Sequence, residues 1–352
     1  MSGFRGFLGR HKVSVAMVAF VLLFYGALYA THRARHPAAP DGAASAQVAA
    51  PPARMTAEEV RQKEERFKES LGRHPRLFSF LSLLFLAGLS AGVATDGVLF
   101  VQRRRGVSIL PRVSHGTVPW GLTEVARFFI LLFFIESLVL GAEIALAALF
   151  RRPEPNHGFL VMFNSVVRDI VIVWLIVRTV TRGFGRRLDE IGLTARDFWG
   201  NVRTGLAAYL AIVPPLLGLL IVMAVLAQAF AYEPPPQPVV EIYLREKTGG
   251  MIVFFTFFVA VLGPVMEEIF FRGFAYKAFR TRYGVSRATL ATAAIFSLLH
   301  ASLIGLVPIF VLGIFLTILY ERTGSLVPGI VAHMTHNLIM VSFTLLFKTL
   351  SA

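Results

Sequence analysis

Residues 251–272 read MIVFFTFFVAVLGPVMEEIFFR, an apolar run that ends in two adjacent carboxylates and a guanidinium. The stretch is long enough, as a helix, to cross the hydrocarbon core of a bilayer. Ionisable groups inside a membrane are costly, and they are retained mainly where they serve a function. Glu267, Glu268 and Arg272 therefore predict a functional site near one end of this span.

The whole chain has the composition of a membrane protein. It has 352 residues, is 55% hydrophobic and contains 32 phenylalanines, whereas soluble domains are roughly 45–50% apolar. Because long apolar runs recur, the predicted fold class is an all-α, polytopic transmembrane helix bundle of about eight or nine membrane helices. The expected spans are 13–30, 77–101, 126–150, 159–180, 205–230, 251–272 and 326–347, with shorter apolar segments at 288–303 and 305–320.

The charge of the chain supports the same class. The formal net charge is +14, from 35 Lys and Arg against 21 Asp and Glu. The basic residues gather in short loops between apolar runs, which is typical of cytoplasmic loops and predicts the N-terminus and loops 102–125, 181–204 and 273–287 inside. No nucleic-acid-binding motif accompanies the charge. The expected partner is therefore the lipid bilayer, and nucleic acid is not expected. The absence of cysteine excludes disulfides, cysteine-ligated zinc and thiol nucleophiles.

Three regions are expected along the chain. Residues 1–76 form an N-terminal membrane anchor, an Ala/Pro-rich linker and a charged helix of about residues 57–71, which a capping box from Thr56 to Glu59 opens. The run 13–30 follows a basic start and can be a cleaved signal or an uncleaved anchor; we expect the anchor. Residues 77–246 supply accessory transmembrane helices, and residues 247–347 form the functional core.

Four charged residues lie in the accessory spans. Glu136 and Glu143 share a helical face, and Arg168 and Asp169 lie in the next span. A charge pair between these spans would relieve the cost of both, so we expect a structural role. An alternative is a transporter that uses the four residues as an ion path, which predicts inverted repeats; none is evident in the sequence.

Spacing within 267–272 suggests a division of labour. Glu268 and Arg272 are four residues apart with the acid first, which is the favourable order for a helical ion pair. Glu267 lies five residues before Arg272, about 140° away from it around the helix. We expect the pair to lock the helix and Glu267 to face a cavity as a general base. A purely structural buried salt bridge is the alternative.

Two later segments carry matching polar residues. His300 follows Phe296 by one helical turn, and His333, His336 and Asn337 lie together on the last span. His and Asn donors on one face of a buried helix can form an oxyanion hole. They can equally form contacts between membrane helices.

Together these motifs resemble a known family. EExxxR, FxxxH and HxxxN, in this order on successive membrane helices, are similar to the motifs of the CPBP intramembrane proteases. That family contains the type II CAAX prenyl endopeptidases and the bacterial Abi and lysostaphin-resistance-A-like proteins. The segment TGSLVPG at 323–329 also resembles the family's lead-in to the last motif. The resemblance covers residues of about 250–345 and says nothing about residues 1–200.

The resemblance implies an intramembrane endopeptidase with a water-based mechanism. Glu267 and His300 would hold and activate a water, and His333 and Asn337 would stabilise the oxyanion. The supporting residues would be Glu268, Arg272 and Phe296. The substrate would be a membrane-associated protein or peptide, lipidated and CAAX-like in the prenyl-protease branch.

A zinc mechanism is the alternative chemistry, and no cofactor is required by the first one. Glu267, His300 and His333 would then be the ligands, with Glu268 as the base, which is the ligand count of a catalytic zinc. The chain has no HExxH motif, so the glutamate-activated water fits these residue types better.

A different class of function uses the same fold without catalysis. The chain would then be a membrane scaffold that confers immunity or presents a partner. We expect the endopeptidase, because a scaffold has no need of an unpaired Glu267 and two motif histidines. The expected location is an integral, multi-pass position, in the cell membrane if the source is bacterial.

Overall fold

The computed structural model describes residues 12–35, 55–106, 113, 115–150, 157–232 and 237–352. The regular elements in these ranges are helical, and eight of the described helices are long and apolar enough to cross a membrane. The predicted class, a polytopic helical membrane protein, is confirmed. Contacts divide the chain into two units, Met1–Arg54 with Thr123–Trp174, and Met55–Leu122 with Leu175–Ala352. The three regions expected from the sequence stay a prediction.

The first unit contains α2 (Lys12–Arg35), nearly all of α5 (Leu122–Phe150) and most of α6 (His157–Arg178). Phe20 of α2 packs edge-on against Phe134 of α5, with ring centroids 5.2 Å apart. The expected charge pair between the third and fourth spans is present: Arg168 lies 3.5 Å from Glu136 and 3.0 Å from Asp169. These contacts offset the cost of placing the charges in membrane helices.

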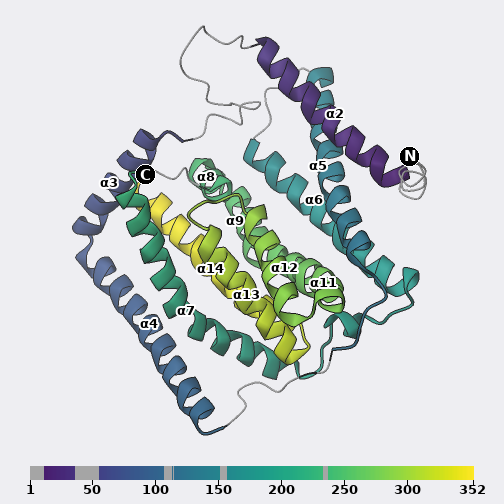
Figure 1. Cartoon of the computed structure of the whole chain (residues 1–352). Coiled ribbons are helices and arrows are strands. Elements are labelled where there is room, and N and C mark those ends of the chain that lie inside the picture. Colours follow the sequence, from purple (N-terminus) through teal and green to yellow (C-terminus); the bar gives the residue numbers. More distant parts are fainter. Residues whose placement is uncertain (1–11, 36–54, 107–112, 114, 151–156, 233–236) are drawn as a thin grey trace. The chain divides into compact units, whose positions relative to one another are not determined.

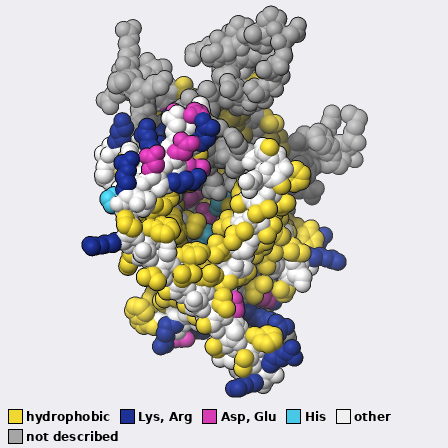
Figure 2. Space-filling model, turned by 90° about the vertical axis from the view of Figure 1, so that its left-hand side faces the viewer, with side chains coloured by type: hydrophobic (Ala, Val, Ile, Leu, Met, Phe, Trp, Pro, Cys, Tyr) yellow, Lys and Arg dark blue, Asp and Glu magenta, His cyan; other side chains and the backbone are white. Residues whose placement is uncertain are grey.

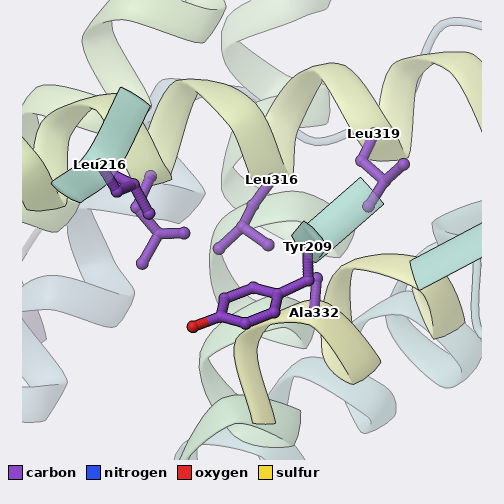
Figure 3. Packing of buried hydrophobic residues seen from close by; sticks show 6 residues of the cluster. Tyr209, Leu216, Leu316, Leu319 and Ala332 are labelled. Carbon is purple, nitrogen blue, oxygen red and sulfur yellow. The ribbon is translucent and has the colours of Figure 1, made fainter. Parts of the chain in front are cut away.

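The second unit is built around α7 (Phe198–Ala229), α13 (Leu306–Thr323) and α14 (Val327–Leu350). In Figure 1, α7 lies beside α14 and α13, and α4 (Pro75–Arg104) runs along the other side of α7. Six buried residues of α7, α13 and α14 form a hydrophobic cluster, of which Figure 3 labels five. They are Tyr209, Leu216, Leu312, Leu316, Leu319 and Ala332.

Glycines let these helices approach closely. A Cβ on Gly205 of α7 would lie 2.6 Å from the carbonyl oxygen of Pro328 in the first turn of α14. A Cβ on Gly92 of α4 would lie 2.7 Å from the carbonyl oxygen of Leu210 in α7. Small residues at helix contacts are a main source of association in lipid, where burial of apolar side chains brings little gain.

The span expected at 251–272 is longer in the structure. It runs without a break through α9 (Gly249–Phe257), η3 (Phe258–Leu262), α10 (Gly263–Glu268), η4 (Ile269–Ala275) and α11 (Tyr276–Tyr283). The expected loop 273–287 is therefore helical as far as Tyr283. The reason is that Phe274, Tyr276 and Ala278 are buried, so this part has a core face, and Gly284, with φ +76°, ends the helix.

The helix α12 (Val285–Leu299) is the short apolar segment expected at 288–303. Its buried face includes Ala293 and Phe296. A Cβ on Gly313 of α13 would lie 3.1 Å from the Cβ of Ala293, so the two helices are in close contact. The helix packs along α13 with this face, while Leu290 and Leu298 on its other face are more than half exposed.

The segment that precedes α5 packs against the C-terminal helices through Trp120 and His115. The ring of Trp120 stacks on Phe274 at 5.4 Å, and its Nε1 donates to the Phe274 carbonyl at 3.1 Å. Arg280 pairs with Glu321 at 3.0 Å and donates to the carbonyl of His115 at 3.2 Å. Burial lowers the pKa of His115 below its usual value.

At the other end of the unit, α3 (Ala57–Arg73) and α8 (Pro238–Arg245) cover the end of α14. The expected capping box is present, because Thr56 Oγ1 accepts from the amide of Glu59 and the Glu59 carboxylate accepts from the amide of Thr56. Phe67 packs on Phe347 at 5.1 Å. Lys348 Nζ donates to the carbonyls of Tyr243 and Glu246 at the end of α8.

Figure 2 shows a broad band of hydrophobic side chains on one face, with Lys and Arg above and below it. Large apolar side chains of α4 such as Phe80, Leu83 and Phe100 are more than half exposed. An exposed apolar surface along a spanning helix is what contact with lipid tails requires. The protein is therefore an integral, multi-pass membrane protein.

The close approach at Gly205 can be tested by substitution. Gly205→Ala would force a methyl group against Pro328, and we expect a loss of about 1–3 kcal/mol in unfolding free energy. Gly218→Ala on the same helix is the matched control, because nothing lies within 4 Å of its Cβ position. It should be neutral or slightly stabilising, since alanine favours helix. Thermal unfolding in detergent measures both, and equal midpoints would contradict the packing described here.

Candidate active site

The two glutamates lie on α10, a short α-helical piece between two π-helical segments. Pro264 in its first turn has no N–H. The preceding amide, that of Gly263, bonds five residues back to the carbonyl of Phe258. Neither Gly263, whose amide bonds to Phe258, nor Pro264, which has no amide hydrogen, donates to the Val259 carbonyl. Asn337 of α14 donates its Nδ2 to that carbonyl at 2.9 Å. π-Helical turns are often found at functional sites.

The expected ion pair is present and fully buried. Arg272 Nη1 donates to Glu268 Oε1 at 2.7 Å, and both side chains are 1% exposed. The second terminal nitrogen, Nη2, donates to the carbonyl of Gly313 on α13 at 3.1 Å. A charge pair without water needs such additional hydrogen bonds to offset its desolvation. The pair therefore ties the sixth span to α13.

Phe296 connects the three motifs through its ring. The guanidinium of Arg272 lies 4.7 Å from the Phe296 ring centroid. The rings of His300 and His333 lie 4.6 Å and 5.8 Å from it. A cation near an aromatic face is attracted by the ring, so Phe296 helps to hold the guanidinium, and its ring also contacts both imidazoles.

His333 bridges the two carboxylates and is 2% exposed. Its Nδ1 donates to Glu268 Oε1 at 3.2 Å, and its Nε2 lies 3.7 Å from Glu267 Oε2. A carboxylate oxygen accepts, so the proton of this bond belongs to Nδ1. The Nε2 atom then acts as a donor only when the ring carries both protons.

His300 is held at the end of α12 in one tautomer. Its Nδ1 lies 2.7 Å from the carbonyl of Phe296. A carbonyl oxygen can only accept, so Nδ1 carries the proton and Nε2 of the neutral ring has a free lone pair. The next residue, Ala301, has φ +48°, a conformation that residues other than glycine adopt at some cost. This turn ends the helix directly after His300.

Glu267 is the accessible member of the group. Its side chain is 34% exposed, while its oxygen Oε2 is buried and has no hydrogen-bond partner among the described residues. Figure 2 shows acidic and histidine side chains in a hollow of the hydrophobic face. A carboxylate that is only partly buried can accept a proton from a bound molecule.

Glycine also shapes the buried side of the group. A Cβ on Gly329 of α14 would lie 3.1 Å from Glu268 Oε2. The absence of a side chain there lets the carboxylate fit against the start of α14. This glycine closes the TGSLVPG segment that resembles the family's lead-in to the last motif.

The ligands of the zinc alternative do not form a metal-binding group. In the described ranges, no group of three or more His, Asp or Glu side chains is arranged so that it could hold a metal ion. Glu267, His300 and His333 therefore do not form the required ligand set in this structure.

Sequence reasoning gave no role to two groups that the structure adds. Tyr209 of α7 contacts His336 of α14, with its hydroxyl 3.4 Å from His336 Nδ1. The carbonyls of Val259 and Gly313 also take part, as acceptors from Asn337 and Arg272. Every residue has a backbone carbonyl, so a sequence motif does not show which carbonyls accept these hydrogen bonds. The position of Pro264, five residues after Val259, was the available signal for the first of them.

The fold and the site define a class: a multi-pass helical membrane protein with a buried Glu–Arg–His centre built from its C-terminal helices. Residues 249–339 match the family model of the type II CAAX prenyl endopeptidases, Rce1-like. The resemblance to the CPBP and CAAX proteases is thus confirmed for this segment, which contains all three motifs. No curated protein and no solved structure matches the chain.

The ion pair at the centre makes a stability prediction. Arg272→Met would leave Glu268 buried without its guanidinium, and we expect a loss of about 3–5 kcal/mol in unfolding free energy. Arg73→Met is the control, because Arg73 and Glu69 form a pair with both side chains mostly exposed and should lose nothing measurable. Thermal unfolding in detergent reports both. A shift of the same size in the two variants would show that Arg272 is not the central contact.

Proposed function

We propose that the chain is an intramembrane endopeptidase that hydrolyses peptide bonds of membrane-associated substrates with a water activated by Glu267 and His300. The observation that carries the proposal is the contrast between two adjacent glutamates. Glu268 is 1% exposed and paired with Arg272, whereas Glu267 is 34% exposed, lies 3.7 Å from His333 and forms no ion pair with Arg or Lys among the described residues. A scaffold needs the first of these and has no use for the second.

In the proposed reaction, water binds between the carboxylate of Glu267 and Nε2 of His300, both of which accept hydrogen bonds. Glu267 takes a proton from the water as general base, and the hydroxide attacks the carbonyl carbon of the substrate. When the C–N bond breaks, the proton passes from Glu267 to the leaving amine. The step needs no covalent intermediate, which suits a chain without cysteine.

The negative charge that develops on the carbonyl oxygen needs donors. Asn337 commits one Nδ2 proton to Val259 and keeps a second N–H for the substrate. His333, fixed by Glu268 and Phe296, supplies Nε2–H when its ring is doubly protonated. Donors held in place before the reaction stabilise the transition state without reorganisation.

The substrate class follows from where the site lies. Two of the three motifs lie on helices long enough to span a membrane, and the third lies on the short helix α12, which packs against α11 and α13. The cleaved segment therefore has to come from a protein or peptide bound at the membrane. A lipid anchor near the cleaved bond would bring such a peptide to the site, as the name of the matching family suggests for prenylated substrates. We include lipidated, CAAX-like peptides among the proposed substrates.

Glu267→Gln tests the general base while preserving the shape of the side chain. We expect cleavage of a quenched, lipidated fluorescent peptide by detergent-purified protein to fall by about 10²–10⁴-fold, because the amide cannot accept the proton. Glu69→Gln, on the exposed part of α3, is the matched control and should cleave at the wild-type rate. A parallel assay with a zinc chelator should leave the wild-type rate unchanged.

Two results would contradict the proposal. Cleavage that survives Glu267→Gln would remove Glu267 from the mechanism. A cellular phenotype that persists in Glu267→Gln, together with no cleavage by the wild type, would instead identify a non-catalytic scaffold.

A further inference from the structure

The candidate site extends to a helix outside the segment that matches the family model. Helix α7 precedes residue 249, yet it packs along α14, which carries His333 and Asn337. The contact begins at Gly205 against Pro328. One turn later, Tyr209 reaches His336 on the same helix as the two motif residues.

The ring of Tyr209 packs in a hydrophobic cluster, and its hydroxyl contacts His336. The residue is 4% exposed and belongs to the hydrophobic cluster of α7, α13 and α14. Figure 3 shows the ring beside Leu316 and Ala332, with the hydroxyl at the end away from Ala332 and Leu319. That hydroxyl lies 3.4 Å from Nδ1 of His336, and the two rings meet edge to face at 6.0 Å.

The direction of this hydrogen bond follows from what else is near. His336 is the one hydrogen-bond partner that the described residues offer the Tyr209 hydroxyl. A buried O–H without an acceptor is costly, so the hydroxyl donates and Nδ1 of His336 accepts. In a neutral imidazole the proton then resides on Nε2. Tyr209 thereby selects the tautomer in which His336 offers an N–H donor.

His336 lies among the motif residues. It precedes Asn337 directly and follows His333 by three residues on α14, so its side chain neighbours that of His333 on the helix surface. His333 donates its Nδ1 proton to Glu268 and Asn337 donates one proton to Val259. An additional neutral donor beside these two partly committed groups would strengthen binding of a developing oxyanion.

We infer that Tyr209 is a positioning residue: its hydroxyl holds His336 in the Nε2–H tautomer, which presents a donor to the carbonyl of the peptide bound beside His333 and Asn337. This inference rests on the proposed endopeptidase function for its use of the donor. The selection of the tautomer does not depend on that function.

Tyr209→Phe is the test, because it removes the hydroxyl and keeps the ring in its cluster. Tyr243→Phe is the matched control: Tyr243 is also buried, at 1% exposure, and its hydroxyl bonds Thr256 away from the motifs. Both variants are purified in detergent, and thermal unfolding records any general loss of stability.

The first readout is the tautomer itself. Nitrogen NMR of histidine-labelled protein, with the His336 signals assigned by His336→Gln, should show the Nε2–H form in the wild type and in Tyr243→Phe. Tyr209→Phe should lose that preference. A wild-type His336 with its proton on Nδ1 would overturn the inference, whether or not the protein cleaves a peptide.

The second readout is kinetics on the lipidated peptide. Tyr209→Phe should lower kcat by about fivefold, the worth of one hydrogen bond, and leave KM near the wild-type value. Tyr243→Phe should change neither. Equal kinetics in the two variants would refute use of the donor in the transition state. Absence of cleavage by the wild type would refute the proposed function, while the NMR result would still decide the role of Tyr209.

Discussion

The buried pair of Arg272 and Glu268 is the contact on which the arrangement of the C-terminal helices depends. Two charges without water persist only if further partners complete their hydrogen bonds. The guanidinium donates to the carbonyl of Gly313 on α13 and lies near the ring of Phe296, and the carboxylate accepts from His333 of α14. The sixth span, α12, α13 and α14 must therefore meet at one point, and the neighbouring Glu267 is placed beside that point with part of its side chain accessible.

Local rules explain why much of this could be predicted from the sequence. The order and spacing of Glu268 and Arg272 predicted their ion pair, and the cost of charges in lipid predicted a partner for Arg168 in the adjacent span. Both contacts are present. The motif residues Glu267, Phe296, His300 and His333 also come together in space, although their roles in a reaction stay predictions. The boundaries of most spans followed from hydrophobic runs alone.

Other features depend on tertiary contacts that no local pattern records. The sixth span continues past Arg272 because its basic end has a buried face against other helices, and loop charge was a poor guide there. His333 was expected to face a substrate, yet one of its nitrogens is committed to Glu268. The contact of Tyr209 with His336 joins residues far apart in sequence, and the glycines that permit such approaches look ordinary until their neighbours are known.

The segment around Pro264 has a wider meaning for how a membrane site is encoded. The proline withholds a hydrogen atom from the helix, the carbonyl of Val259 is left available, and Asn337 on a different span takes it. Because Pro264 has no N–H and the amide of Gly263 bonds to Phe258, the helix supplies no backbone donor to the Val259 carbonyl, and Asn337 can donate to it. The orientation of the Asn337 side chain thus depends on a backbone donor that is missing from another helix. A comparison of side-chain motifs does not record such a dependence.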